Sequence, residues 1–260
     1  MPRAAPPQVI PRPDTWRPGA PAPWAEVPLG RRTGIGVVRV LEALDANGQL
    51  GPVPEEVGSD EIFGPLLVDE DRFDEDRFDE GRAPNGRRVN AGVLATLFEE
   101  RGEARVILTR RSSRLRTHKG EVSFPGGRLD AGESVAEAAV REAHEEVGLD
   151  PRQVTTVGWI HPVMTMASAS LIVPVLATVP ARPHLVANPH EVERVFDVAL
   201  ADLADPAVFH EERWRVPGRT VPGSEDDWFP VWFFEISGEI IWGATARMLR
   251  ELLSLVLLGS

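Results

Sequence analysis

Three glutamates spaced to share one face of a helix are the residues of this sequence best suited to chemistry. Glu142, Glu145 and Glu146 stand at positions i, i+3 and i+4, which lie side by side on a helix surface. Exposed carboxylates this close repel one another by about a few tenths of a kcal/mol per pair. A divalent cation would turn that repulsion into ligation, and oxygen-only ligands suit Mg²⁺ or Mn²⁺. The alternative is a solvated acidic face.

The helix that must carry these carboxylates has start and stop signals in the sequence. Ser134 followed three residues later by Glu137 is a capping-box pair, so the helix should begin at Val135. Gly148 should end it after Val147, because glycine readily adopts the left-handed conformation. A separate apolar stripe can dock the helix on a sheet and consists of Ala136, Val140, Ala143 and Val147.

The run from Gly127 to Leu149, GRLDAGESVAEAAVREAHEEVGL, resembles the Nudix box. Every fixed position matches: Gly127, then Glu133 after five residues, then REAHEEVGL after seven more. The one departure is Ala143, where the family prefers a larger aliphatic residue. The resemblance implies Mg²⁺-dependent hydrolysis of a nucleoside diphosphate linked to another group. It also implies an α/β fold, the Nudix α/β/α sandwich with a mixed β-sheet.

A basic segment, LTRRSSRLRTHKGEVSFPGG at 108–127, precedes the box in an otherwise acidic chain. Arginine forks match phosphate oxygens, so the cluster suits a polyanionic substrate; alternatively, it neutralises nearby acidic residues. The segment is similar to the coenzyme A pyrophosphatase branch of the Nudix family, as is IWGATARML at 241–249. By this resemblance coenzyme A or an acyl derivative would be cleaved to adenosine 3′,5′-bisphosphate and (acyl-)4′-phosphopantetheine. The expected substrate-binding residues are Arg110, Arg111, Ser112, Arg116, His118, Gly126 and Gly127.

Within the box, the resemblance and the spacing together suggest roles for each charged residue. Glu142 and Glu146 should be the most direct metal ligands, because carboxylates at i and i+4 converge best, with Glu145 supporting them. Glu133 and Arg141 should form a structural pair that holds the loop against the helix. Glu133 as an outer metal contact is the alternative.

The general base is less constrained by the box. In Nudix enzymes it can lie in the box or in a later loop, which leaves Glu145, Glu191 and Glu193 as candidates. We take Glu191 as the expected catalytic base, in addition to Glu142, Glu145 and Glu146. The alternative for Glu191 and Glu193 is a pair of surface carboxylates on a helical stretch.

Apolar alternation predicts the strands that should position the box helix. The expected strands span 90–98, 105–111, 154–163, 171–179, 208–215, 228–236 and 240–242, and a final helix begins at Gly243. The segment 189–203 should be helical or mixed, because its apolar residues have helical spacing.

We divide the chain into an N-terminal extension, 1–88, and a Nudix hydrolase domain, 89–260. Residues 1–30 are dense in proline and should form an extended arm. Trp16 and Trp24 could fix this arm to the domain or to a partner subunit. Residues 45–88 are acidic and repeat DRFDE at 71–75 and 76–80, which predicts a solvated, partly flexible loop.

Composition narrows the possible partners and compartments. The net charge of −12 argues against a general nucleic-acid or anionic-membrane binder. The 260 residues include no cysteine, which excludes disulfides and thiolate chemistry and fits a reducing cytoplasm. We see no secretory signal or membrane span, and homodimerisation is compatible with the arm. Two rival functions stay open: a Nudix pyrophosphatase for ADP-ribose or another nucleoside diphosphate derivative, and a non-catalytic Nudix-fold binding module.

Overall fold

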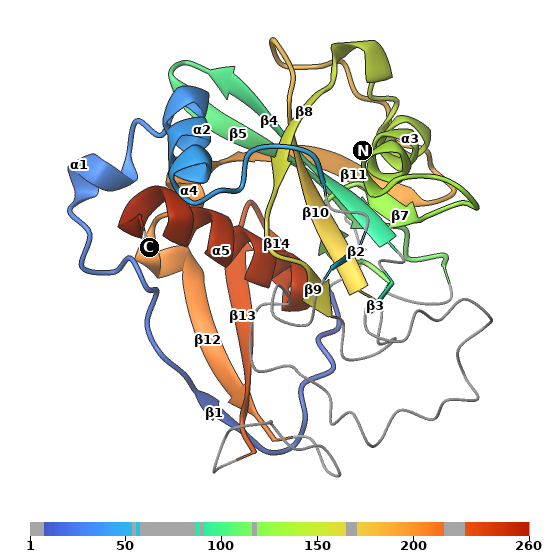
Figure 1. The fold of residues 1–260 in the computed structure, drawn as a ribbon. Coiled ribbons are helices and arrows are strands. Elements are labelled where there is room, and N and C mark those ends of the chain that lie inside the picture. The colour runs from blue at the N-terminus through green and yellow to red at the C-terminus, as the bar shows by residue number, and fades with distance from the viewer. Residues whose placement is uncertain are drawn as a thin grey trace, which may run out of the picture.

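The computed structural model describes residues 8–53, 56–57, 87–88, 91–115, 119–164, 171–215 and 227–259. In these parts the chain forms two main β-sheets with helices packed on them (Figure 1). A two-residue pair, β2 (Glu56–Val57) with β3 (Arg87–Arg88), lies apart from both sheets. None of the helices in the described ranges is long and apolar enough to cross a membrane.

The larger sheet has eight strands and a mixed topology. Its main strands run in the order β11-β5-β4-β10-β8, where β11 is Val192–Ala199, β5 Glu103–Arg111, β4 Ala91–Glu100, β10 Leu171–Thr178 and β8 Thr155–Trp159. β10 and β4 pair in parallel and the other neighbours are antiparallel. Three short strands complete the sheet: β6 (Val122–Ser123), β7 (Gly126–Arg128) and β9 (Val163–Met164). The mixed sheet predicted from the sequence is confirmed.

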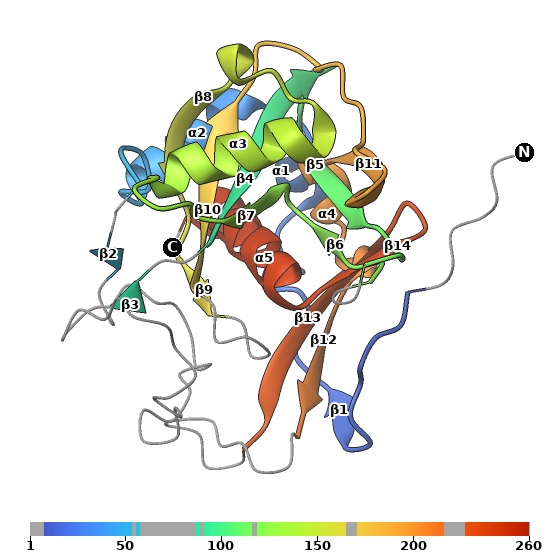
Figure 2. The same cartoon turned by 90° about the vertical axis from the view of Figure 1, so that its right-hand side faces the viewer.

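Helices cover both faces of this sheet, as Figure 2 shows. On one face lies α3 (Val135–Val147), which packs on β4 and β7. On the other lie α2 (Val37–Ala46), the single-turn α4 (Leu200–Leu203) and α5 (Gly243–Leu258). Each face has its own apolar core, and Ala139, Ala143 and Val147 of α3 belong to the smaller one. The predicted α/β/α sandwich is therefore present.

The second sheet joins the two ends of the chain. Its order is β1 (Trp16–Pro18), β12 (Phe209–Trp214), β13 (Phe229–Ile236) and β14 (Glu239–Trp242), all antiparallel. Trp24, which follows β1, is completely buried and packs edge-on against Phe209 and stacked on Phe234. The proline-rich arm is thus fixed to its own domain. The boundary predicted at residue 89 lies outside the described residues, and the two-part division stays a prediction.

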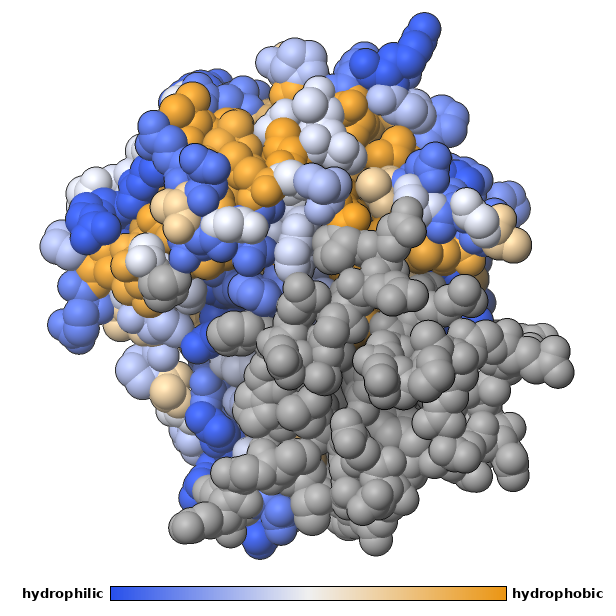
Figure 3. Space-filling view, in the orientation of Figure 1, coloured by the Kyte–Doolittle hydropathy of each residue, from blue (hydrophilic) through white to orange (hydrophobic). Residues whose placement is uncertain are grey.

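The N-terminal segment also supplies apolar surface. Leu29 of the single-turn helix α1 (Leu29–Arg32) and Val38 of α2 are each 66% exposed, and Leu258 at the end of α5 is 44% exposed. Figure 3 shows apolar residues gathered over α1 and α2, in the left half of that view. The proposed homodimer is not tested by this surface and stays a prediction.

For the segment 189–203, predicted to be helical or mixed, the structure is mixed and the fully helical alternative is wrong. Residues 189–203 form mainly the strand β11, and only Leu200–Leu203 are helical. β11 pairs with β5 from Val192 opposite Arg111 to Ala199 opposite Arg105. The helical spacing of the apolar residues was misleading, because β-branched valines and an available neighbouring strand favour extended backbone over weak local helix preference. Two 3₁₀ turns, η4 (Pro151–Gln153) and η5 (Pro206–Val208), were not predicted.

We expect Ser134→Ala to lower the free energy of unfolding by about 1 kcal/mol. The Ser134 hydroxyl accepts from the backbone N–H of Glu137 at 3.3 Å, and alanine leaves that donor without its cap. Urea unfolding of metal-free protein would measure the loss. Ser134→Asp keeps an acceptor at the same place and should stay within a few tenths of a kcal/mol of the natural protein. Equal losses in both variants would contradict the capping argument.

Candidate metal and diphosphate site

The helix α3 begins and ends where its sequence predicts. Ser134 and Glu137 form both hydrogen bonds of a capping box, and Gly148 ends the helix with φ 67°. Its amide donates to the carbonyl of His144 at 2.9 Å. With both ends fixed, Glu142 and Glu146 occupy set positions on the face beside β7.

Three carboxylates from two elements converge at this face. Glu142 and Glu146 of α3 and Glu191, which precedes β11, each offer an oxygen, and these oxygens lie within 4.8 Å of one another. Burial raises the pKa of Glu146 to about 7, and the negative charges of Glu142 and Glu191 add to the effect. Burial likewise raises the pKa of Glu142. Like charges held together in a poorly solvated place fit a divalent cation, which would offset their repulsion.

Two glycines of β7 allow the sheet to approach these carboxylates. The amide of Gly126 donates to a carboxylate oxygen of Glu146 at 3.2 Å. Gly126 has φ 157°, and a Cβ there would lie 2.4 Å from the carbonyl oxygen of Gly92. At Gly127 a Cβ would lie 2.4 Å from a carboxylate oxygen of Glu142. The expected contacts of both glycines with substrate stay predictions; what they contact in the protein is the carboxylate pair.

Gly127→Ala should therefore weaken binding of Mn²⁺ by at least about tenfold, because the new methyl group displaces the Glu142 carboxylate. Calorimetric titration with Mn²⁺ would measure it. Gly132→Ala is the matched control for strain in the same loop: Gly132 has φ 83° but open space around its Cβ. Equal loss of affinity in both variants would point to loop strain and contradict displacement of Glu142.

Arg141 connects the loop before the helix with the carboxylate face. Its guanidinium donates to both oxygens of Glu133, at 2.8 and 3.0 Å, and to the carbonyl of Arg128 at 3.0 Å. It also donates to Glu142 at 3.0 Å and to Glu145 at 3.4 Å. The hydrogen bond from Arg141 lowers the pKa of Glu133. The geometry matches the pair expected from the sequence, and Glu145, with 54% of its side chain exposed, faces Arg141 and not the three converging carboxylates.

Glu191 reaches the site through a turn that the sequence analysis missed. The amide of Asn188 donates to the carbonyl of Glu146 at 2.8 Å, which fixes the turn on the end of α3. The amide of Glu191 then donates to the carbonyl of Asn188 at 3.1 Å, and the amide of Ser112 donates to the carbonyl of Glu191 at 2.7 Å. The dipeptide Asn188-Pro189 is a turn signal that could have indicated this break.

Glu193, a further candidate for the general base, lies on β11 and belongs to a different network of charged residues. Glu193 lies 3.5 Å from Arg110, whose guanidinium also donates to Glu239 at 2.9 Å. Glu239 is buried and accepts from Arg194 as well, at 2.9 Å. Arg110 is only 5% exposed and would have to leave this network to contact a substrate. No sequence signal indicated Glu239, because its partners lie far away along the chain.

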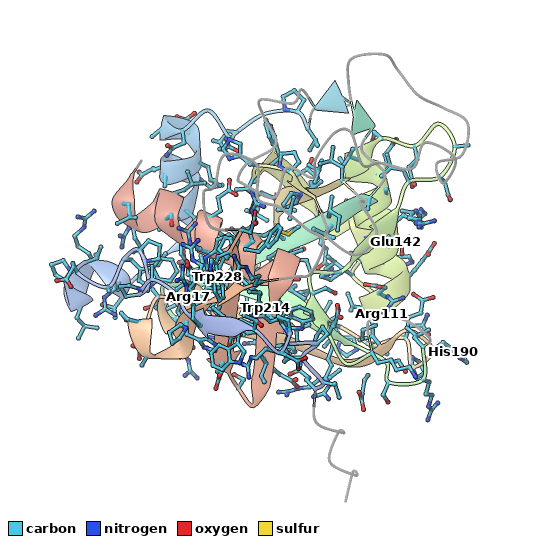
Figure 4. All side chains as sticks on the ribbon, turned by 90° about the horizontal axis from the view of Figure 1, so that it is seen from below. Arg17, Arg111, Glu142, His190, Trp214 and Trp228 are labelled. Carbon is cyan, nitrogen blue, oxygen red and sulfur yellow. The ribbon has the colours of Figure 1, made fainter. Side chains whose placement is uncertain are left out.

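Arg111, one of the predicted substrate-binding residues, acts on the pKa of a carboxylate in the site. Its positive charge lowers the pKa of Glu146, and its buried Nε has no hydrogen-bond partner among the described residues. Figure 4 labels Arg111 and Glu142 on the same side of the molecule when it is seen from below. The Ser112 hydroxyl is buried and accepts from the amide of Arg114 at 3.4 Å. The remaining two predicted contacts, Arg116 and His118, lie outside the described residues.

Comparison with known proteins agrees with this geometry. The family model described as the NUDIX domain matches residues 86–216, half of the chain. The chain is 35% identical over 207 residues to "Nudix hydrolase 15, mitochondrial" of Arabidopsis thaliana, over 76% of this chain and 65% of that protein. It is 34% identical to "Uncharacterized Nudix hydrolase NudL" of Citrobacter koseri, over 56% of this chain and 72% of that protein. The chain thus spans slightly less than two thirds of the length of the Arabidopsis protein.

Among solved structures, a Nudix hydrolase from M. smegmatis, RenU, matches with 27% identity and a TM-score of 0.39, over 46% of this chain and 78% of that chain. The family model carries the assignment, because it covers the strands, the loop and the helix that build the carboxylate site. The chain belongs to the Nudix family.

Proposed function

We propose that the protein hydrolyses the diphosphate bond of coenzyme A or acyl-coenzyme A with a divalent cation, Mg²⁺ or Mn²⁺. The products would be adenosine 3′,5′-bisphosphate and (acyl-)4′-phosphopantetheine. The observation that carries the reaction class is the convergence of Glu142, Glu146 and Glu191 beside Arg111. The substrate is supported by the basic segment 108–127 and its similarity to the coenzyme A branch.

In this proposal Glu142 and Glu146 hold the cation, and Glu145 supports them from the rim through Arg141. When bound, the cation would polarise the phosphoryl oxygens, lower the pKa of a water and neutralise charge on the leaving group. The positive charge of Arg111 acts on Glu146, and in this proposal Arg111 would orient a diphosphate oxygen. Glu133 and Arg141 hold the loop rigid, which keeps Gly127 against Glu142.

Glu191 is the proposed general base. It approaches the carboxylates of α3 from a different element, so its position depends on the turn at Asn188 and not on the metal helix alone. It would accept the proton of the attacking water while the bond between one phosphorus and the bridging oxygen breaks. The bridging oxygen leaves with the other phosphate.

The test is product identification with purified protein and Mg²⁺ or Mn²⁺. Coenzyme A, an acyl-coenzyme A and ADP-ribose are supplied in parallel, and products are identified by mass. Release of adenosine 3′,5′-bisphosphate from coenzyme A supports the proposal. Turnover of ADP-ribose alone would reject the substrate and keep the reaction class. Metal binding without turnover of any nucleoside diphosphate derivative would favour a non-catalytic module.

A further inference from the structure

Arg247 of the helix α5 is buried and Arg250 is half-buried, and neither has an acidic hydrogen-bond partner among the residues that the structure describes. Arg247 is only 5% exposed, and burial lowers its pKa to about 10. Burial also lowers the pKa of Arg250. Removing a cation from water is costly unless a counter-charge or hydrogen bonds replace the lost hydration. Such groups are therefore expected to have an anionic partner.

The carboxylates nearest to these cations are engaged elsewhere. Glu251 accepts from the backbone N–H of His161 at 3.1 Å and from its ring. Glu211 accepts from the indole N–H of Trp232 at 2.9 Å and pairs with Arg213 at 2.6 Å. Both carboxylates act on the arginines only through longer-range electrostatic attraction.

Within the described ranges, neither arginine forms an ion pair or donates a hydrogen bond. Their recorded contact is the ring of Trp232, with the guanidinium carbons 5.9 Å (Arg247) and 5.1 Å (Arg250) from its centroid. The Nε of Arg250 is fully buried and without a partner. Two guanidinium groups near one indole ring, with no acceptor for them among the described residues, have the donors that an oxyanion needs.

We propose that Arg247, Arg250 and Trp232 bind a phosphate group. Arginine forks offer paired donors to tetrahedral oxyanions, and the indole wall supplies a surface against which they are oriented. This phosphate would be the one in coenzyme A that is remote from the diphosphate. That assignment rests on the proposed function. Free inorganic phosphate has the same chemistry and is the alternative source.

α5 lies on the opposite face of the larger sheet from α3, and strands connect it to the diphosphate site. β14 leads directly into α5 and packs beside β6, and β6 is followed by the glycines of β7 that contact Glu146 and Glu142. α5 would thus bind the remote phosphate of the substrate, which α3 does not contact.

Phosphate binding can be tested without turnover. The full chain in EDTA is titrated with inorganic phosphate and its Tm is recorded, for the natural protein, Arg247→Met and Arg250→Gln. Arg152→Met is the control, because it removes the same charge from a side chain that is 89% exposed. Phosphate should raise the Tm of the natural protein and of Arg152→Met. The rise should fall by at least half in both α5 variants.

The Tm measured without phosphate distinguishes a binding arginine from a structural one. Replacing an arginine that stabilises the fold would lower this Tm. Arg247→Met should have a Tm equal to or above that of the natural protein when phosphate is absent, because it removes a buried cation without a counter-charge. A lower Tm in Arg247→Met, with the phosphate-induced rise intact, would overturn the proposal. No phosphate-induced rise in the natural protein would overturn it as well.

Kinetics would identify the source of the phosphate. If it is the remote phosphate of the substrate, Arg247→Met should raise KM for coenzyme A by about tenfold or more. KM for 3′-dephospho-coenzyme A, which lacks that group, should be unchanged. Equal KM changes for the two substrates, with phosphate binding lost, would support the same site and assign it to a free anion. The Tm experiment keeps its meaning even if coenzyme A is not turned over.

Discussion

Glu146→Gln should lower kcat/KM by about a thousandfold and at the same time stabilise the metal-free protein at pH 8. Burial raises the pKa of Glu146 from 4.5 to about 7. The folded state therefore holds this proton more tightly than the unfolded chain does. Stability is lost as the pH rises from 4.5 to 7, and above 7 the full cost of a buried carboxylate is present. That cost is about 3 kcal/mol, and glutamine, which has no charge, should recover much of it.

The loss of turnover has a separate cause. Glutamine offers a neutral oxygen where the cation needs a carboxylate, so we expect kcat/KM to fall by about a thousandfold, corresponding to several kcal/mol of metal catalysis. Urea unfolding in EDTA at pH 8 and pH 5 measures the stability change, which should shrink at pH 5. Glu145→Gln is the matched control for the stability change only, since more than half of that side chain is exposed. Full activity in Glu146→Gln, or a loss of stability at pH 8, would reject the assignment.

The helix α3, which carries Glu142 and Glu146, could be predicted from the sequence because its start and stop signals are local. The capping box, the left-handed glycine and the apolar stripe all lie within 15 consecutive residues, from Ser134 to Gly148. Each acts through hydrogen bonds or packing within the helix or at its ends. The apolar runs of β4 and β5 are similarly local, and their ladder follows from the two-residue turn at Arg101 and Gly102.

The position of Glu191 could not be predicted in the same way. It depends on hydrogen bonds from Asn188 to the end of α3 and from Ser112 to Glu191 itself, which join segments far apart in the sequence. The local pattern around it favoured a helix, and pairing with β5 made it a strand. Trp24 is a similar case: proline predicts an extended arm, but only the rings of Phe209 and Phe234 determine where its tryptophan packs.

Glu191→Gln should lower kcat by a factor of about 10² to 10⁴, the usual contribution of a general base. Binding of Mn²⁺ should stay within about threefold of the natural protein, because Glu142 and Glu146 keep both proposed ligating carboxylates. Steady-state kinetics and calorimetric titration of each variant would measure kcat and the affinity for Mn²⁺.

Glu193→Gln is the matched control, two residues further along the same segment. Glu193 faces Arg110 at 3.5 Å and does not belong to the converging carboxylates, and Arg110 keeps its bond to Glu239 in this variant. Its kcat should therefore stay within about threefold, because the converging carboxylates are unchanged and Arg110 retains a carboxylate partner. If kcat and Mn²⁺ affinity fall together in Glu191→Gln, Glu191 is a metal ligand and the proton goes elsewhere. If Glu193→Gln shows the larger loss of kcat, the general base is Glu193 on β11 and not Glu191, which precedes that strand.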